Sequence, residues 1–342
     1  MALHSEQDFL ELIDRLFPQG PAAGPRQAGH VLLGRGDDCA VLRCPERMCV
    51  SADLFLEDVH FRRSYFEPEE VGYKALAVNV SDIASMGARP LGFCLQLFGP
   101  VGRSGPASPA GQIGKTGVTE EWWARMLAGM ADLARGLDLA LAGGDLSRGA
   151  AVGLAVTVWG EAGPGGRFLQ RRTARAGDDL FLVGDVGLAR AGLLALESRG
   201  REACRELPRA TAAHLRPVLH VDQALHLGSL DFVRGLMDVS DGLAMDLPRF
   251  LPPGLGADLS LGEADLDREI VEFARERGED PLRFALAGGE DYALLGVAEP
   301  GSAGALADAV PGARIIGRVL DAPGILLAGR PAAVDGFDHF AV

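Results

Sequence analysis

Apolar residues recur at helical spacing in several stretches of the chain. Residues 5–17 carry them three and four apart and are followed by Pro18, which predicts an amphipathic helix that ends there. A second helix is expected over residues 68–87, and Thr119 is a candidate N-cap for a third helix with Trp122 on its apolar face. The remaining helices are predicted over residues 186–199, 209–227 (divided at Pro217) and 267–277.

Short apolar runs between these helices are typical of β-strands. The runs at 138–142 and 151–159 flank Gly143-Gly144-Asp145, which we expect to be a turn. Strands and helices are mixed without strict alternation, so the fold class is predicted to be α+β. The strands are predicted at residues 31–33, 39–42, 48–55, 91–98, 138–142, 151–159, 179–183, 235–239, 256–261, 291–298, 313–319 and 324–328.

The length of 342 residues favours two domains. A Gly- and Pro-rich break at 160–168 is the best candidate for their boundary. We therefore expect an N-terminal domain of residues 1–160 and a C-terminal domain of residues 161–342. Residues 99–118 are rich in Gly, Pro and Ser, which predicts a flexible surface insertion in the first domain.

The net charge of the chain excludes some kinds of binding partner. Forty-seven Asp and Glu against 33 Lys and Arg give a net charge of −14, which argues against nucleic acid and anionic membranes as partners. No apolar stretch approaches the roughly 18 residues that a membrane span needs. The five cysteines include no Cys-x-x-Cys pair, and the first residues lack the features of a secretory signal, so a cytoplasmic protein with reduced thiols is expected.

Acidic residues beside Gly or Ser recur at the ends of the short apolar runs. A single Asp in such a place is most simply a turn residue. Several of them converging in the fold would repel one another unless cations compensated, and oxygen ligands without His or Cys favour magnesium bound together with phosphate. The set therefore suggests a metal–polyphosphate site. Its segments are Gly36-Asp37-Asp38, Ser51-Ala52-Asp53, Ser81-Asp82, Gly143-Gly144-Asp145, Asp238-Val239-Ser240-Asp241 and Gly289-Glu290-Asp291.

Longer segments around these acids resemble the thiamine-monophosphate kinase family. They follow the family's order over about residues 30–340, nearly the whole chain. Single motifs are shared with the wider superfamily of aminoimidazole ribonucleotide synthetase and selenophosphate synthetase, whereas the block 73–90 and Gly336-Phe337-Asp338-His339-Phe340 are similar to the kinase branch in particular. The matching segments are 36–42, 51–61, 73–90, 143–149, 237–243, 287–292 and 335–340.

This resemblance implies a fold and an activity. The implied fold is a two-domain aminoimidazole ribonucleotide synthetase-like α+β fold, with an N-terminal mixed or antiparallel sheet and a C-terminal α+β domain that completes the active site. A homodimer would form through the N-terminal sheets. The implied activity is transfer of the γ-phosphoryl group of ATP to thiamine monophosphate, giving thiamine diphosphate, with several Mg²⁺ ions and with ATP as co-substrate.

The resemblance also assigns roles to single residues. Positions that match the family's metal ligands are Asp38, Ser51, Ala52, Asp53, Asp82, Asp145, Asp238 and Asp241. Positions that match ATP contacts are Gly144, Asp145, Arg171 and Ser240, and those that match substrate contacts are His60, Glu290 and Phe337. Asp38, Asp82, Asp238 and Arg171 are expected to carry catalysis. For His60, a packed histidine beside Phe61 is an equal alternative.

Two departures from the family pattern keep other interpretations open. Ala52 stands where a hydroxyl residue is usual, and Leu146-Ser147 replaces a usual Thr-Thr. One alternative is a related synthetase that uses ATP on another acceptor, although a selenophosphate synthetase should carry a reactive Cys in its N-terminal segment and none precedes Cys39. The other is a catalytically decayed homologue that binds a nucleotide or thiamine.

Overall fold

The computed structural model describes residues 6–20, 29–100 and 118–331. The chain forms two compact units, the first from residues 1–80 and 90–161 and the second from residues 81–89 and 162–342. Helices and strands are mixed in the order of an α+β protein, as predicted. Most of the predicted insertion and the whole segment with Phe337 lie outside the described residues. No described helix is both long and apolar enough to cross a bilayer.

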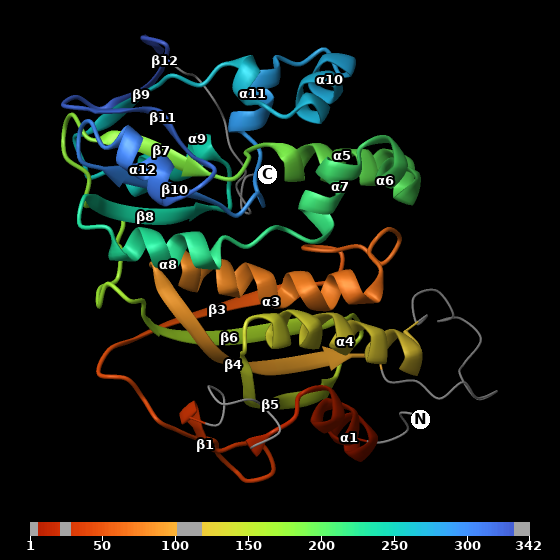
Figure 1. Cartoon of the computed structure of the whole chain (residues 1–342). Coiled ribbons are helices and arrows are strands. Elements are labelled where there is room, and N and C mark those ends of the chain that lie inside the picture. Colours follow the sequence, from red (N-terminus) through yellow and green to blue (C-terminus); the bar gives the residue numbers. More distant parts are fainter. Residues whose placement is uncertain (1–5, 21–28, 101–117, 332–342) are drawn as a thin grey trace. The chain divides into compact units, whose positions relative to one another are not determined.

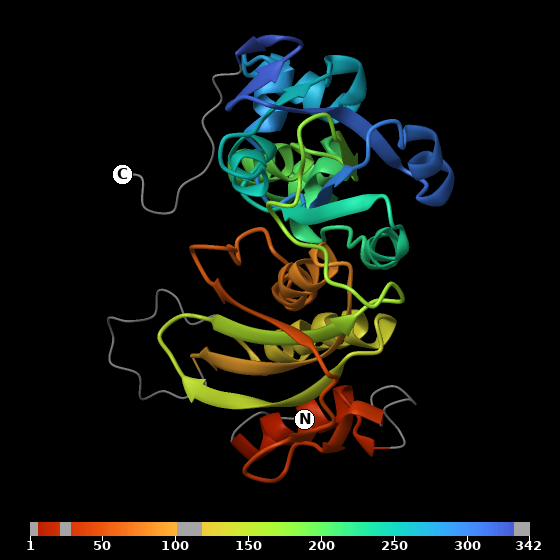
Figure 2. The ribbon, with the colours of Figure 1, turned by 90° about the vertical axis from the view of Figure 1, so that its left-hand side faces the viewer.

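The first unit is built on a four-stranded mixed sheet with strand order β3-β6-β4-β5 (Figure 1 and Figure 2). Strand β3 is antiparallel to β6, and β4 is parallel to β5. From residue 6 to residue 162 the elements are α1 (Glu6–Leu16), β1 (Val31–Leu33), β2 (Val41–Leu42), β3 (Met48–Leu56), α3 (Pro68–Ser85), β4 (Ala88–Gly99), α4 (Glu120–Gly136), β5 (Ala140–Arg148) and β6 (Gly153–Ala162).

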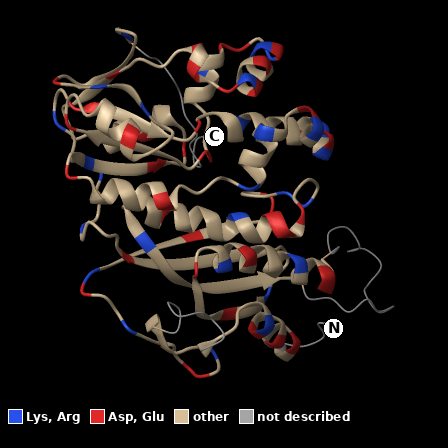
Figure 3. Cartoon of the chain, in the orientation of Figure 1, with Lys and Arg blue, Asp and Glu red and all other residues tan. Residues whose placement is uncertain are grey.

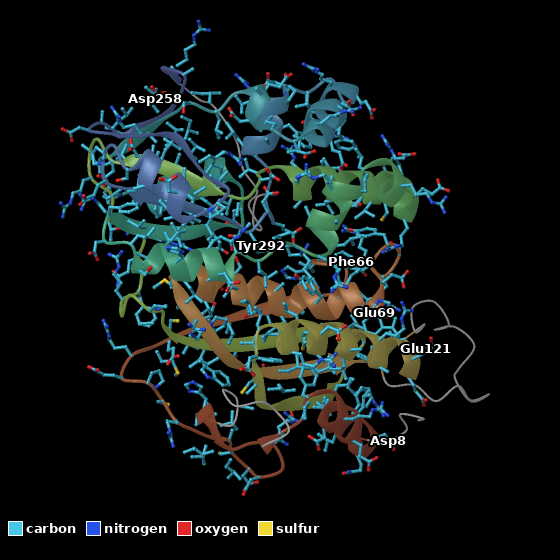
Figure 4. The ribbon with its side chains drawn as sticks, in the orientation of Figure 1. Asp8, Phe66, Glu69, Glu121, Asp258 and Tyr292 are labelled. Carbon is cyan, nitrogen blue, oxygen red and sulfur yellow. The ribbon has the colours of Figure 1, made fainter. Side chains whose placement is uncertain are left out.

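Helices α3 and α4 run side by side because a glycine in each lets the two backbones approach closely (Figure 1). A Cβ atom on Gly72 would lie 1.8 Å from the carbonyl oxygen of Met126, and one on Gly129 would lie 2.1 Å from that of Glu69. Figure 4 labels Glu69 at the start of α3. These distances are far below van der Waals contact, so neither glycine tolerates a side chain without movement of a helix.

Helix α4 starts where the sequence predicts, but the face that it buries differs from the predicted one. The Thr119 hydroxyl accepts a hydrogen bond from the amide of Trp122, which confirms the predicted N-cap. Trp123 is buried and Trp122 is only half-buried, contrary to the predicted face. The Trp123 ring meets Phe9 of α1 edge-on at 5.8 Å. Both tryptophans are at helical spacing from Met126, so the periodicity did not separate them.

The predicted turn at Gly143-Gly144-Asp145 is wrong, because all three residues lie inside strand β5. Strand β5 pairs with β4, and Gly144 is opposite Leu95. A Cβ atom on Gly144 would lie 1.8 Å from the Leu95 carbonyl oxygen. The glycine therefore permits a close approach between two strands. From the sequence alone, a glycine with this role cannot be distinguished from a glycine in a turn.

The second unit is built on a seven-stranded sheet with strand order β13-β12-β9-β11-β7-β10-β8. Strands β7 and β10 are buried along their whole length, so both faces of the sheet are covered. The elements are β7 (Asp179–Val183), α5 (Leu188–Arg199), α6 (Ala203–Glu206), α7 (Pro208–Leu215), α8 (Val221–Ser229), β8 (Val233–Val239), α9 (Leu243–Phe250), β9 (Gly256–Leu259), α10 (Arg268–Glu276), α11 (Pro281–Leu286), β10 (Ala293–Ala298), α12 (Ala303–Ala309), β11 (Ala313–Leu320), β12 (Gly324–Leu327) and β13 (Arg330–Pro331).

The helices of the second unit follow the predicted breaks. The chain is divided at Pro217, between α7 and α8, as expected. Helix α9 packs Leu243, Leu247 and Phe250 against one face of the sheet. Acidic and basic residues both occur along α5, α6 and α10 (Figure 3), and the ion pair of Arg199 with Glu206 joins α5 to α6. The positive charge there is therefore matched locally by carboxylates.

Gly129→Ala should destabilise the first unit, because the added methyl group forces α3 and α4 apart. We expect the free energy of unfolding to fall by about 1–3 kcal/mol. Gly136→Ala at the end of the same helix is the matched control, since nothing lies within 4 Å of its Cβ position. That variant should be neutral or slightly stabilising. Thermal unfolding checks both, and equal melting temperatures would contradict the proposed helix contact.

Candidate functional site

The predicted site residues are divided between the two units. The first unit holds Asp38, Ser51, Ala52, Asp53, His60, Gly144 and Asp145. The second holds Asp82, Arg171, Asp238, Ser240, Asp241 and Glu290. Phe337 lies outside the described residues.

Asp82, Asp238 and Arg171 come together in the second unit. Asp238 is the penultimate residue of strand β8 and is 3% exposed. Its Oδ2 atom accepts a hydrogen bond of 2.7 Å from the Ser81 hydroxyl. Burial and the nearby Asp82 carboxylate raise the pKa of Asp238 to about 6, while Ser81 and the Arg171 guanidinium act in the opposite direction. The structure thus joins three of the four residues expected to carry catalysis.

The loop from Ser240 to Asp241 is held by Asp246, a residue that the sequence analysis missed. The Oδ2 atom of Asp246 accepts hydrogen bonds from the amides of Ser240 (3.0 Å) and Asp241 (2.9 Å). Asp246 is 1% exposed, and burial raises its pKa to about 6. Arg249 contacts the carboxylates of both Asp241 and Asp246. An Asp in the first turn of a helix after Ser-Asp-Gly is the local signal that would have identified it.

The turn that carries Glu290 is strained and firmly attached. Glu290 and Tyr292 both have positive φ angles, 62° and 51°, in a region that favours glycine. The Glu290 amide donates to the Ser240 carbonyl oxygen (2.7 Å), and the Tyr292 amide donates to that of Val239 (2.9 Å). Figure 4 labels Tyr292 at the end of this turn. The substrate candidate Glu290 is therefore fixed directly to the loop that carries the metal and ATP candidates.

Asp291 caps helix α5 from this turn, a role that the sequence analysis did not identify. Its carboxylate accepts hydrogen bonds from the amides of Gly187 (2.6 Å) and Ala189 (2.9 Å) at the start of the helix. Removal of the carboxyl group from water raises the pKa of Asp291 to about 8, although the two amides favour the charged form. No spacing in the sequence signals this cap, because the acid and the helix are far apart in the chain.

In the first unit, the candidates on β3 alternate between the two faces of the strand. Ser51 and Asp53 share one face, and Ala52 points to the other. The amide of Asp53 donates a hydrogen bond of 3.1 Å to the Asn79 side chain of helix α3. Ala52 has no side-chain ligand, so only its backbone carbonyl is available to a cation. Strand β3 thus presents two oxygen-bearing side chains on one face.

The other acids of the first unit lie at exposed positions. Asp38 is exposed in the bend before β2, and its amide donates a hydrogen bond of 2.8 Å to the Asp37 carboxylate. Asp145 is exposed on the edge strand β5, next to Gly144. Their carboxylates are accessible from solvent, so a cation can reach them.

His60 is anchored in the loop after β3. Its Nδ1 atom accepts a hydrogen bond of 3.0 Å from the Leu56 amide, and its ring stacks on Phe55 with 5.9 Å between centroids. The loop includes Asp58, with a φ angle of 64°. These contacts give His60 a packing role, as in the alternative stated from the sequence, and they also hold its ring in one orientation.

The donor set of the second unit fits a divalent cation, which its family fold implies. Asp82 and Asp238 supply hard oxygen ligands, and their repulsion is the kind that a bound cation relieves. Among the residues that the structure describes, no three Asp, Glu, His or Cys side chains converge into a complete metal site. The protein side chains there would therefore leave coordination positions for phosphate oxygens or water, as magnesium usually requires.

Comparisons with known proteins identify relatives over nearly the whole length. Residues 36–162 match the family model "AIR synthase related protein, N-terminal domain". The thiamine-monophosphate kinase of Mycobacterium tuberculosis (strain ATCC 25618 / H37Rv) is 35% identical over 321 residues, covering 92% of this chain and 86% of that protein.

Two solved structures extend this similarity to the fold. A crystal structure of thiamine-monophosphate kinase from Stenotrophomonas maltophilia K279a has a TM-score of 0.77 at 31% identity, covering 94% of this chain and 96% of that one. A structure of AaThiL complexed with AMPPCP and TMP has a TM-score of 0.73 at 27% identity, covering 98% and 97% respectively. The aminoimidazole ribonucleotide synthetase-like fold expected from the sequence is confirmed.

The raised pKa of Asp291 predicts a pH-dependent stability. The folded protein keeps a proton on this carboxyl up to about pH 8, whereas the unfolded chain releases it near pH 4. Its contribution to stability is therefore complete below about pH 4 and is lost as the pH rises toward 8. We expect the difference in free energy of unfolding between the wild type and Asp291→Asn to decrease between pH 5 and pH 8.

Urea unfolding at several pH values measures this difference. Asp222→Asn, at an exposed position of α8, is the control and should show a difference that does not change with pH. A constant or increasing difference for Asp291→Asn would contradict the proton held in the folded state.

Proposed function

The chain belongs to the thiamine-monophosphate kinase family, and we propose that it transfers the γ-phosphoryl group of ATP to thiamine monophosphate, which yields thiamine diphosphate. The similarity to named kinases at 35% identity over 92% of the chain carries this conclusion. The grouping of Asp82, Asp238 and Arg171 supports it, because two acids and a guanidinium suit a magnesium–phosphate site.

We assign binding of the triphosphate to charged side chains and backbone groups of the candidate residues. Phosphoryl transfer requires alignment and neutralisation of charge more than a covalent intermediate. Arg171 would donate hydrogen bonds to phosphate oxygens, and Ser240 and Gly144-Asp145 would contact the nucleotide. Asp246 supports this assignment for Ser240, since it fixes the backbone of that residue through a buried carboxylate.

Several Mg²⁺ ions are part of the proposal. The residues that would hold them are Asp38, Ser51, Asp53, Asp82, Asp145, Asp238 and Asp241, with the backbone of Ala52. Magnesium held there would neutralise the negative charge that spreads over the triphosphate during transfer. The elevated pKa of Asp238 supports a cation at this position, because a buried carboxylate beside a second one is costly without one.

Recognition of thiamine monophosphate is assigned to Glu290, His60 and Phe337. Glu290 is a carboxylate suited to the amino and cationic groups of thiamine, and an aromatic side chain such as Phe337 suits its rings. The strained and anchored turn of Glu290 supports this assignment, because positive φ angles in non-glycine residues are concentrated at functional positions. The acceptor phosphate is already ionised at neutral pH, so no general base is required.

We further propose a cytoplasmic homodimer. The five cysteines are all free thiols, as in a reducing compartment. Most of the exposed large apolar side chains are gathered between residues 32 and 59, on β1, β2, β3 and the following loop. On β3, Met48, Val50 and Leu54 share one exposed face, with Val50 57% exposed. An edge strand with an exposed apolar face is unfavourable in water. We therefore propose that β3 of a second copy of the chain packs against this face.

Turnover with purified protein tests the activity. Incubation with ATP, thiamine monophosphate and Mg²⁺ should give thiamine diphosphate and ADP in equal amounts, measured by chromatography. Cleavage of ATP only with a different acceptor would instead favour a related synthetase. Binding of ATP without any turnover would favour the decayed homologue to which Ala52 and Leu146-Ser147 point.

Asp82→Asn and Asp238→Asn should each lower kcat by about 100-fold or more, because each removes a negative ligand from the phosphate site. Asp222→Asn is the matched control, since Asp222 is exposed on α8 and outside the proposed site. The Asp82 and Asp238 variants should also need more Mg²⁺ for half-maximal activity than the wild type. Equal rates for all three variants would argue against the ligand assignment.

Val50→Glu should convert the dimer into a monomer, because a charge on the exposed face of β3 cannot be covered by a second copy. Size-exclusion chromatography with light scattering gives the mass. Val218→Glu is the control, since Val218 is 66% exposed but lies in the second unit. A wild-type protein that is monomeric at micromolar concentration, or a Val50→Glu dimer, would rule out this interface.

A further inference from the structure

The Glu290 carboxylate lies against a histidine that no functional motif includes. The Nδ1 atom of His214, on α7, is 3.1 Å from the Oε2 atom of Glu290. The His214 side chain is 2% exposed and that of Glu290 is 29% exposed. The histidine is therefore behind the carboxylate, while part of Glu290 remains accessible to a ligand.

We propose that His214 is a positioning residue for substrate recognition, which holds the Glu290 carboxylate in the orientation that meets the cationic or amino groups of thiamine monophosphate. This inference rests on the proposed function, and specifically on the assignment of Glu290 to substrate. Its physical basis is that a Glu side chain has several rotamers, and a fixed partner on one oxygen removes most of them before the ligand arrives.

His214 can act as a fixed partner because α7 is packed rigidly against α5. A Cβ atom on Gly192 of α5 would lie 2.0 Å from the carbonyl oxygen of Ala210, so the two helix backbones are in direct contact. The Thr211 hydroxyl, one turn before His214, is turned back onto the helix and donates to the Leu207 carbonyl oxygen at 2.8 Å. The imidazole is thus carried by a backbone with little freedom to move.

The start of α5 is attached to the same turn that carries Glu290. Asp291, the neighbour of Glu290, accepts hydrogen bonds from the Gly187 and Ala189 amides at the start of α5. The contacts form a closed circuit from Glu290 through Asp291 to α5, from α5 to α7, and from His214 on α7 back to Glu290. The Asp291 cap fixes the backbone of the turn, and His214 fixes the side chain that the turn presents.

Three variants test this role by steady-state kinetics. His214→Leu removes the polar contact at similar volume, His214→Asn keeps a polar group near the Nδ1 position, and Glu290→Gln removes the charge that His214 is proposed to orient. We expect His214→Leu to raise KM for thiamine monophosphate roughly tenfold, the scale of one lost hydrogen bond to a charged group. KM for ATP should be unchanged, and His214→Asn should restore most of the loss.

The double variant separates positioning from general structural damage. If His214 acts through Glu290, His214→Leu should have little further effect on KM for thiamine monophosphate when Glu290→Gln is already present. His226→Leu, at an exposed position of α8, is the control and should leave both KM values at the wild-type level. Melting temperatures of all variants establish that they are folded, and if His214→Leu does not fold, His214→Asn with its own double variant supplies the comparison.

The outcomes distinguish this inference from the function on which it rests. Absence of thiamine diphosphate formation by the wild type would overturn the proposed function. An active wild type whose His214 variants change KM for ATP and thiamine monophosphate equally, or whose effects add fully to that of Glu290→Gln, would overturn the positioning role alone.

Discussion

The arrangement at the end of strand β8 depends on a carboxylate that folding removes from water. Asp238 is 3% exposed and lies beside Asp82, with the Ser81 hydroxyl as a hydrogen-bond donor. Two carboxylates at short range in a poorly hydrated setting repel each other unless a proton or a cation compensates. Burial and, in addition, this repulsion raise the pKa of Asp238. A buried carboxylate beside a second one costs stability, and the magnesium proposed above would offset that cost.

Glycines let the two loops next to this carboxylate pass each other. A Cβ atom on Gly242, whose φ angle is 101°, would lie 2.8 Å from the carbonyl oxygen of Gly288. One on Gly289 would lie 2.8 Å from that of Ser240. The Ser-Asp-Gly and Gly-Gly-Glu-Asp motifs are therefore two halves of one packing arrangement, which brings the Glu290 amide within 2.7 Å of the Ser240 carbonyl oxygen. The glycines of both motifs thus permit the close packing of the two loops.

Local patterns in the sequence predicted the elements well and their contacts poorly. The strand at 179–183 and the Thr119 cap were predicted correctly, because both depend on residues close in the chain. The glycines before Asp145 were assigned to a turn, since their close approach to β4 depends on a distant strand. The acids of the candidate site were found through motifs. Asp246 and His214 were missed because their roles depend on contacts that form only in the fold. Asp246 contacts backbone amides, and His214 contacts the Glu290 carboxylate.

The charges of the second unit explain how an acidic protein can bind an anionic acceptor in one direction. Thiamine monophosphate has an aminopyrimidine ring at one end, a cationic thiazolium ring in the middle and a phosphate at the other end. Glu290 presents a negative charge supported by His214, while Arg171 presents a positive charge near Asp238. A reversed ligand would place its phosphate beside the Glu290 carboxylate, where the two negative charges repel each other. Asp238, near Arg171, also lies beside Asp82, so carboxylates partly offset the positive charge of Arg171. The magnesium that we propose at Asp82 and Asp238 would supply further positive charge at the phosphate end.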